Sequence, residues 1–151
     1  MKQKWVDMYL DFALRLAEES HTVRLKVGAV FVSPEGVIST GINGLPAGGS
    51  NVCEVSITDN IDSNNPTIRL VTKPEVSHAE EALFSKLMKQ GVSTKDGRIF
   101  LTHSPCINCS KMIIGAGITY VHYLKDYRSM DGVAWLLQND VEVIKESHAA
   151  I

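Results

Sequence analysis

Two short stretches carry residue types that can bind a metal ion and move a proton. The first holds His78 and Glu80 and the second holds Cys106 and Cys109, so the chain reads H-x-E and later P-C-x-x-C. One imidazole and two thiolates suit zinc, and three protein ligands leave a fourth tetrahedral position open for water. Glu80 stands close enough to His78 to reach that water. The pattern predicts a catalytic zinc site, since a structural site would be closed by four protein ligands.

Helix N-termini are expected to position both stretches. Ser104 is a suitable N-cap and Pro105 suits the first helical position, which places the two cysteines on one face of the first turn. The positive end of that helix favours thiolates and so helps a metal to bind. Ser77 can cap a second helix, with His78 and Glu80 in its first turn. Two helix N-termini would then converge on one metal ion.

Each part of the pattern also has an ordinary explanation. A single C-x-x-C can be a redox pair or half of a structural zinc site. Ser77 and Glu80 match a capping box, in which Glu80 would serve only the helix end. His78 alone would be an ordinary, partly buried histidine. The combination favours the catalytic interpretation, and H-x-E with P-C-x-x-C is the signature of zinc-dependent nucleobase deaminases.

Composition indicates one globular domain. The chain has 151 residues, 44% of them hydrophobic, which is enough for a substantial core. Its formal charge of −2 gives no sign of a nucleic-acid-binding surface. Cys53 is the single cysteine outside the motif, which argues against a disulfide framework and for a reducing compartment. No apolar run approaches membrane-spanning length and the N-terminus does not resemble a signal peptide, so we expect a cytoplasmic protein without a membrane partner.

The spacing of apolar residues predicts a single α/β domain over residues 1–151. Helices are expected over 5–19, 78–90, 105–116 and 129–139, and strands over 27–32, 37–41, 98–102, 118–124 and 141–144. The first two strands should form a hairpin, and the later strand–helix–strand units should be parallel and right-handed. This order predicts a three-layer α/β/α sandwich with a mixed sheet of about five strands. Both metal-binding segments then begin helices at one edge of the sheet.

Two segments between these elements are irregular in sequence. Residues 41–49 contain four glycines and a proline, which is typical of a loop in unusual backbone conformations. Residues 50–76 are polar and weakly periodic, with 60–66 the most loop-like part. We expect a long loop or insertion there, which covers the site or forms a subunit contact.

Four segments together resemble the deoxycytidylate (dCMP) deaminase family of the zinc-dependent cytidine deaminase-like superfamily. They are S-x-x-x-R-x-K-V-G-A-V at 20–30, T-G-I-N-G-L-P-A-G at 40–48, H-A-E at 78–80 and S-P-C-I-N-C-S-K-M-I-I at 104–114. The zinc motifs are common to the superfamily, whereas the glycine-rich loop and the Arg/Lys segment are specific to the dCMP branch. Ile42 stands where the family commonly has tyrosine. Family members often carry extra Cys and His before H-A-E that can hold a second zinc; residues 54–77 contain neither, so one zinc per chain is expected.

The resemblance implies hydrolytic deamination of dCMP to dUMP and ammonia, which supplies dUMP for thymidylate synthesis. Zinc lowers the pKa of its bound water, and the resulting hydroxide attacks C4 of the pyrimidine. Glu80 takes a proton from that water, passes it to ring nitrogen N3 and returns a proton to the departing amino group.

Substrate contacts follow from the same resemblance. Asn43 is expected to meet the sugar or base, although it can equally cap the glycine-rich turn. Arg24 and Lys26 are expected to meet the 5′-phosphate, or else form a solvated surface pair. Three more residues complete the implied substrate-binding set: Ser20, Ala79 and Tyr127. Four histidines are not nominated as metal ligands: His21, His103, His122 and His148.

Family resemblance further implies a homo-oligomer, often a hexamer, activated by dCTP with Mg²⁺ and inhibited by dTTP. The loop at 41–49 is the expected place for a regulatory nucleotide. One alternative is a tRNA or other polynucleotide adenosine deaminase, which would need a basic groove and a pocket for a flipped base. A free cytidine, guanine or pterin-type deaminase would have less use for Arg24 and Lys26. The third alternative is a non-catalytic zinc module in which Glu80 only caps a helix.

Overall fold

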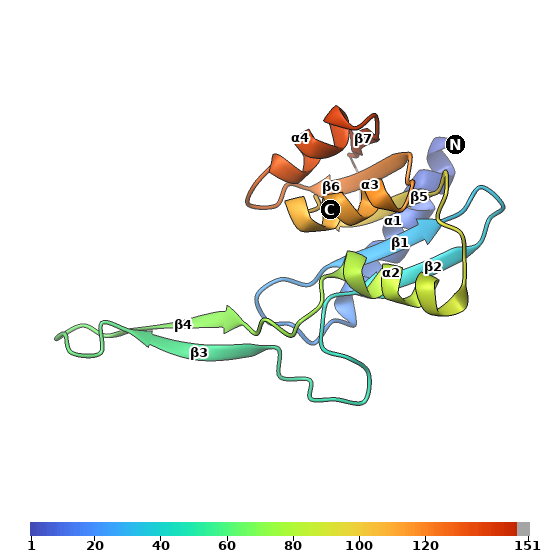
Figure 1. Cartoon of the computed structure of the whole chain (residues 1–151). Coiled ribbons are helices and arrows are strands. Elements are labelled where there is room, and N and C mark those ends of the chain that lie inside the picture. Colours follow the sequence, from blue (N-terminus) through green and yellow to red (C-terminus); the bar gives the residue numbers. More distant parts are fainter. Residues whose placement is uncertain (148–151) are drawn as a thin grey trace.

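Five strands form one mixed sheet at the centre of the computed structural model, which describes residues 1–147 (Figure 1). They are β1 (Gly28–Val32), β2 (Ile38–Ile42), β5 (Arg98–His103), β6 (Tyr120–Lys125) and β7 (Glu142–Lys145), in the spatial order β2-β1-β5-β6-β7. Strand β1 is antiparallel to β2 and β5, whereas β5, β6 and β7 run parallel. The expected mixed, five-stranded sheet is confirmed.

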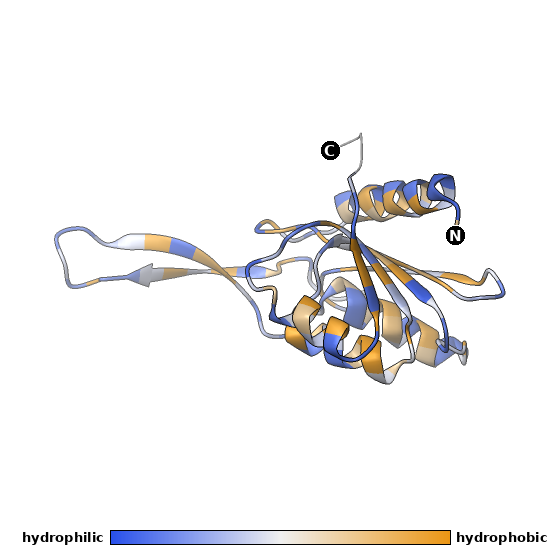
Figure 2. Ribbon diagram, turned by 90° about the horizontal axis from the view of Figure 1, so that it is seen from above, coloured by the Kyte–Doolittle hydropathy of each residue, from blue (hydrophilic) through white to orange (hydrophobic). Residues whose placement is uncertain are grey.

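Four helices cover the two faces of this sheet: α1 (Gln3–Glu18), α2 (Ala79–Gln90), α3 (Ile107–Gly115) and α4 (Asp131–Gln138). Helix α1 lies alone on one face and the other three lie on the opposite face (Figure 2). Successive side chains of a strand point to opposite faces, so Phe100 packs toward α1 while Ile99 and Leu101 pack toward α2, α3 and α4. The expected three-layer α/β/α arrangement is confirmed. None of the helices among residues 1–147 is both long and apolar enough to span a membrane.

The segment at 50–76 differs from the expected loop. It contains a hairpin of β3 (Glu54–Asp59) and β4 (Thr67–Thr72), which extends away from the sheet (Figure 1). The residues of its turn, 60–66, are those that the sequence marks as loop. Val55 and Ile57 point to one face of the hairpin while Ile68 and Leu70 point to the other, and all four are exposed. These apolar residues alternate with polar ones in each strand, a strand signal that the expectation of a loop overlooked, although neither face of the hairpin is buried.

Candidate metal centre and active site

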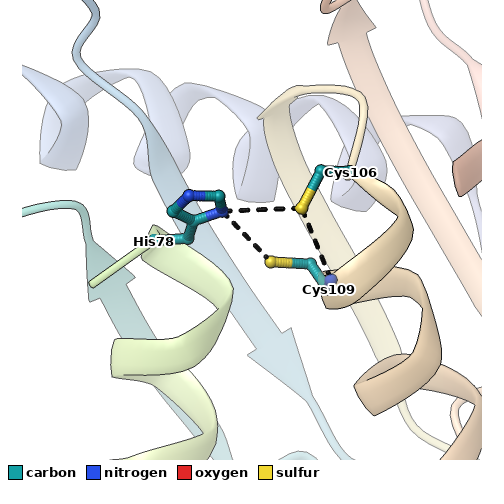
Figure 3. A group of neighbouring side chains, drawn as sticks. All are labelled: His78, Cys106 and Cys109. Carbon is teal, nitrogen blue, oxygen red and sulfur yellow. Dashed lines mark hydrogen bonds between the residues drawn. The ribbon is translucent and has the colours of Figure 1, made fainter. Parts of the chain in front are cut away.

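Three metal-binding side chains converge between the starts of α2 and α3. The Nδ1 atom of His78 lies 3.6 Å from Sγ of Cys106 and 3.4 Å from Sγ of Cys109 (Figure 3). The ligand atoms of these three residues all lie within 4.8 Å of one another. No other group of three or more His, Cys, Asp or Glu among residues 1–147 is arranged in this way. The structure therefore brings together the three residues that the sequence nominates for zinc.

The metal-binding residues themselves cap the two helices. His78 is the N-cap of α2, and its backbone N–H donates to Oε1 of Glu81 at 3.1 Å. Cys106 is the N-cap of α3, and its Sγ accepts the backbone N–H of Cys109 at 3.5 Å. Glu81 thus provides the helix-capping carboxylate, which leaves the neighbouring Glu80 available for another role.

The expectation that two serines cap these helices is wrong. Ser77 instead pairs its backbone with Gly44, through N–H···O contacts of 2.9 and 3.1 Å, which ties the glycine-rich loop to the start of α2. The hydroxyl of Ser104 accepts the backbone N–H of Tyr127 at 2.8 Å. The backbone of Ser104 donates to Lys125 at the end of β6. Both serines therefore hold neighbouring loops against the two helix starts.

The chemistry of the three donors fits zinc. Hydrogen bonds from Cys109 and His78 lower the pKa of Cys106 to about 3, so one thiolate is present in the metal-free chain. The hydrogen bond to Cys106, together with burial, raises the pKa of the Cys109 thiol. The same thiolate raises the pKa of His78 to about 9. A divalent ion that displaces the shared protons would gain two thiolates and one imidazole, the donor set that zinc prefers.

Glu80 is a buried carboxyl group beside this centre. Its side chain is on the first turn of α2 and only 5% of the residue is exposed. Loss of hydration on burial raises its pKa to about 7. Both the protonated and the ionised form are then populated near neutral pH. A carboxyl group of this kind can accept and return a proton, which is the property of a general base and acid.

A cavity of about 520 Å³ opens onto the metal centre. Besides His78, Glu80 and Cys106, it is lined by four residues that the sequence nominates for substrate binding: Arg24, Asn43, Ala79 and Tyr127. Two further nominated residues, Ser20 and Lys26, do not line it. Ser20 is buried and its hydroxyl donates to the backbone oxygen of Asn43 at 2.7 Å. Lys26 donates from Nζ to the backbone oxygen of Glu18, at the end of α1.

The side chain of Asn43 holds the segment that joins α1 to β1. Its Oδ1 accepts the backbone N–H of Val27 at 2.9 Å and the hydroxyl of Ser20 at 2.9 Å. Its Nδ2 donates to the backbone oxygen of Leu25 at 2.7 Å. Asn43 therefore shapes the cavity wall by fixing residues 20–27, in addition to facing the cavity itself.

Several cavity residues were not anticipated from the sequence. Arg128 follows strand β6 and His103 is the last residue of strand β5, and these two strands are parallel. The rule that sites form at the carboxyl ends of parallel strands would have indicated both residues. The guanidinium of Arg128 lies 5.7 Å from the ring of Tyr127. Glu54 and Thr72 come from the base of the β3–β4 hairpin, which occupies the segment expected to be a loop, and nothing in the sequence places them at this cavity.

The fold and the His/Cys/Cys centre with its buried glutamate define a zinc-dependent deaminase. The sequence pattern of the family "Cytidine and deoxycytidylate deaminase zinc-binding region" matches residues 3–125. The chain belongs to this family, and its resemblance to dCMP deaminases is confirmed.

Three relatives illustrate the similarity. The dCMP deaminase of cyanophage S-TIM5, solved in complex with dCMP and dUMP, has a TM-score of 0.83 and 38% identity, covering 97% of this chain and 99% of that one. The deoxycytidylate deaminase of Mycobacterium phage D29 is 30% identical over 124 residues, 81% of this chain and 95% of that protein. ComE operon protein 2 of Bacillus subtilis is 35% identical over 125 residues, 83% of this chain and 61% of that longer protein.

Proposed function

We propose that the chain converts dCMP and water to dUMP and ammonia. One observation carries the proposal: two members of a zinc-type donor trio, His78 and Cys106, line a cavity of about 520 Å³ together with Glu80, a buried carboxyl group with a pKa of about 7. The likeness over 97% of the chain to an enzyme solved with dCMP and dUMP supports the choice of substrate. The product would supply thymidylate synthesis, in the cytoplasm, where thiols remain reduced.

Glu80 moves the protons of this reaction. Zinc held by His78, Cys106 and Cys109 would lower the pKa of a water ligand and make a nucleophile available at neutral pH. The Glu80 carboxylate accepts one proton of that water and gives it to N3 of the pyrimidine as the water oxygen bonds to C4. It then takes the remaining proton from the new C4 hydroxyl and gives it to the amino group. The C4–N bond breaks, ammonia leaves and C4 becomes a carbonyl. General acid–base assistance of this kind contributes about 10² to 10⁴ in rate.

Two arginines form the proposed phosphate end of the cavity. Arg24 and Arg128 both line it, and neither is ion-paired with an acidic side chain of residues 1–147. A guanidinium with unpaired N–H donors suits a phosphate dianion, which can accept two parallel hydrogen bonds. Asp126, also in the cavity wall, is already paired with Lys145 at 2.6 Å. Ala79 and Tyr127 remain as proposed neighbours of the pyrimidine and sugar.

Substrate comparison tests this proposal. Ammonia release would be measured with zinc-loaded protein on dCMP, deoxycytidine, CMP and a short tRNA anticodon stem-loop. We expect turnover of dCMP far above that of deoxycytidine. Equal activity on dCMP and deoxycytidine would contradict the proposed phosphate contacts but would still support the zinc chemistry. Activity on the RNA alone would identify a polynucleotide adenosine deaminase, and inactivity on all four, also with dCTP and Mg²⁺, would point to the non-catalytic zinc module.

We also propose a homo-oligomer, with a hexamer as the expected state, activated by dCTP with Mg²⁺ and inhibited by dTTP. The family resemblance supports this, as do the apolar side chains exposed on the β3–β4 hairpin, where Ile61 and Ile68 are each 74% exposed. Exposed apolar surface of this kind is typical of a protein contact. Sedimentation velocity tests the assembly. Kinetics with each triphosphate test the regulation, and unchanged rates with both dCTP and dTTP would contradict the proposed regulation.

A further inference from the structure

The base of the β3–β4 hairpin forms part of the wall of the active-site cavity. Glu54 and Thr72 stand opposite each other in the hairpin register, and both line the cavity. Glu54 is 8% exposed, and Glu80 is the other buried carboxylate in residues 1–147. A buried carboxylate requires hydrogen-bond donors in compensation. The partners of Glu54 therefore indicate its role.

Glu54 holds two successive backbone amides of the segment that joins α1 to β1. Its Oε1 accepts the N–H of Val23 at 2.8 Å and the N–H of Arg24 at 3.2 Å. This segment has no regular secondary structure, so side chains must fix its backbone. Asn43 fixes the later part, through Leu25 and Val27, and Glu54 fixes the part that carries Arg24.

The side chain of Arg24 is held at the same place. Its Nη1 donates to the hydroxyl of Thr72 at 3.3 Å, directly across the hairpin from Glu54. The two cross-strand partners thus hold both the backbone and the guanidinium of Arg24. Since the carboxylate of Glu54 is directed at the backbone amides, it sets the position of the arginine without forming an ion pair with the guanidinium.

We propose that Glu54 is a positioning residue for recognition of the substrate 5′-phosphate. It fixes the backbone of Val23 and Arg24 so that the Arg24 guanidinium is presented to the phosphate. The inference rests on the proposed function, because it assigns Glu54 to the phosphate end of that same cavity. It also makes the base of the hairpin a determinant of the preference for nucleotides over nucleosides.

The test compares kcat and KM for dCMP and for deoxycytidine in the zinc-loaded full chain. Glu54→Ala leaves both amides unpartnered, so we expect KM for dCMP to rise about tenfold, while kcat for dCMP and kcat/KM for deoxycytidine stay within about threefold. Glu54→Gln keeps an acceptor oxygen and should restore KM to within about threefold of the wild-type value. In an Arg24→Ala background, Glu54→Ala should raise the KM for dCMP little further, because both substitutions remove the same contact between Arg24 and the phosphate.

Three outcomes would overturn the proposal: an unchanged KM for dCMP in Glu54→Ala, an equal loss with both substrates, or full additivity with Arg24→Ala. Zinc content and the thermal unfolding temperature would be measured for every variant, so that only variants that are folded and zinc-loaded like the wild type are compared. Should Glu54→Ala not fold, Glu54→Asp keeps the charge but shortens the reach by one methylene, and an unchanged KM for dCMP in that variant would also overturn it. If the wild-type protein does not turn over dCMP, the proposed function and this inference are both contradicted. If the wild type is active and the KM for dCMP is unchanged in Glu54→Ala, only the inference is contradicted.

Discussion

Two adjacent glutamates at the start of α2, Glu80 and Glu81, have different surroundings and therefore different roles. Glu81 is half-exposed and accepts the backbone N–H of the N-cap residue His78. Glu80 is buried, lines the cavity and has a pKa raised to about 7 by loss of hydration. The helix end is thus satisfied without Glu80, which removes the capping explanation that its sequence position allows. A buried carboxyl group beside a metal centre is better explained by proton transfer.

A pair of matched substitutions separates the two duties. Glu80→Gln keeps size and polarity but cannot carry a proton, so we expect zinc to remain bound and kcat to fall by about 10² to 10⁴. Glu81→Gln keeps an acceptor for the N-cap amide and should leave kcat within about threefold of the wild-type value. Zinc content and kcat of both variants would be measured together. Turnover retained by zinc-loaded Glu80→Gln would exclude its role as the proton carrier.

At the scale of elements, α4 packs closely against the start of α3 and so fixes the metal-binding turn. Gly132, the second residue of α4, has no room for a side chain. A Cβ there would overlap the backbone carbonyl of Pro105 and lie 2.7 Å from both the carbonyl carbon of Cys106 and Oγ of Ser110. The placement of Cys106 therefore depends on a helix that supplies no ligand.

We predict that Gly132→Ala destabilises the domain by about 1–3 kcal/mol, because the overlap must be relieved by movement of the backbone. Zinc affinity should fall as well, since the displaced backbone carries Cys106. The control is Gly115→Ala in the last turn of α3, where the added carbon meets no atom within 4 Å other than its chain neighbours and the backbone of its own helix. That change should be neutral or slightly stabilising. Urea unfolding and zinc competition would measure both variants, and equal stability of the two would contradict the packing argument.

The β3–β4 hairpin has little beyond its own pairing to stabilise it. A two-stranded hairpin without a covering layer is marginally stable in water. We therefore predict that its backbone amides exchange with solvent faster than those of the β1–β2 hairpin, which α1 and α2 cover. Hydrogen exchange read by mass spectrometry, at concentrations where the chain is monomeric, compares the two hairpins within one sample. Equal protection would show that the β3–β4 hairpin is stabilised by more than its own strands.

How far the sequence predicts this site depends on the range of the contacts involved. The metal-binding residues lie in two motifs of fixed spacing, so local chemistry indicates them even though the helix caps are His78 and Cys106 rather than serines. The sheet and helices follow from burial patterns, which the sequence records. Arg128 and Glu54 reach the cavity only through the tertiary fold. Lys26, nominated by its motif, lies instead at the end of α1, because motif membership does not fix the direction of a side chain.

At the scale of the whole molecule, a buried histidine joins both ends of the described chain to the sheet. His122 on β6 is 3% exposed, and its Nδ1 lies 2.8 Å from Oε1 of Glu146, which follows β7. The other carboxylate oxygen of Glu146 accepts a hydrogen bond from Nε2 of Gln3 at the start of α1. The imidazole stacks on Phe100, with ring centroids 4.9 Å apart. Its Nε2 is buried and has no partner in residues 1–147, which suits a neutral ring with its single proton on Nδ1.

Burial therefore lowers the pKa of His122, even though Glu146 acts in the opposite direction. Below a pH of about 6.5, the usual histidine pKa, the unfolded chain takes up a proton at this position more readily than the folded chain. The free energy of unfolding must then fall as the pH falls through that value, by up to about 1.4 kcal/mol per pH unit for one proton. Above it the ring is neutral in both states and contributes no dependence on pH.

Replacement of the ring isolates this contribution. We predict that His122→Asn is less stable than the wild type at pH 7.5, because packing on Phe100 is lost, and that the difference narrows by about 1 kcal/mol at pH 5.5. Urea unfolding at the two pH values would measure it, with zinc removed from both proteins so that loss of the metal does not contribute. His21→Asn, at an exposed histidine outside this contact, is the matched control. A constant difference would mean that burial and Glu146 cancel and leave the pKa of His122 unshifted, and a widening difference would mean that Glu146 outweighs burial and raises this pKa.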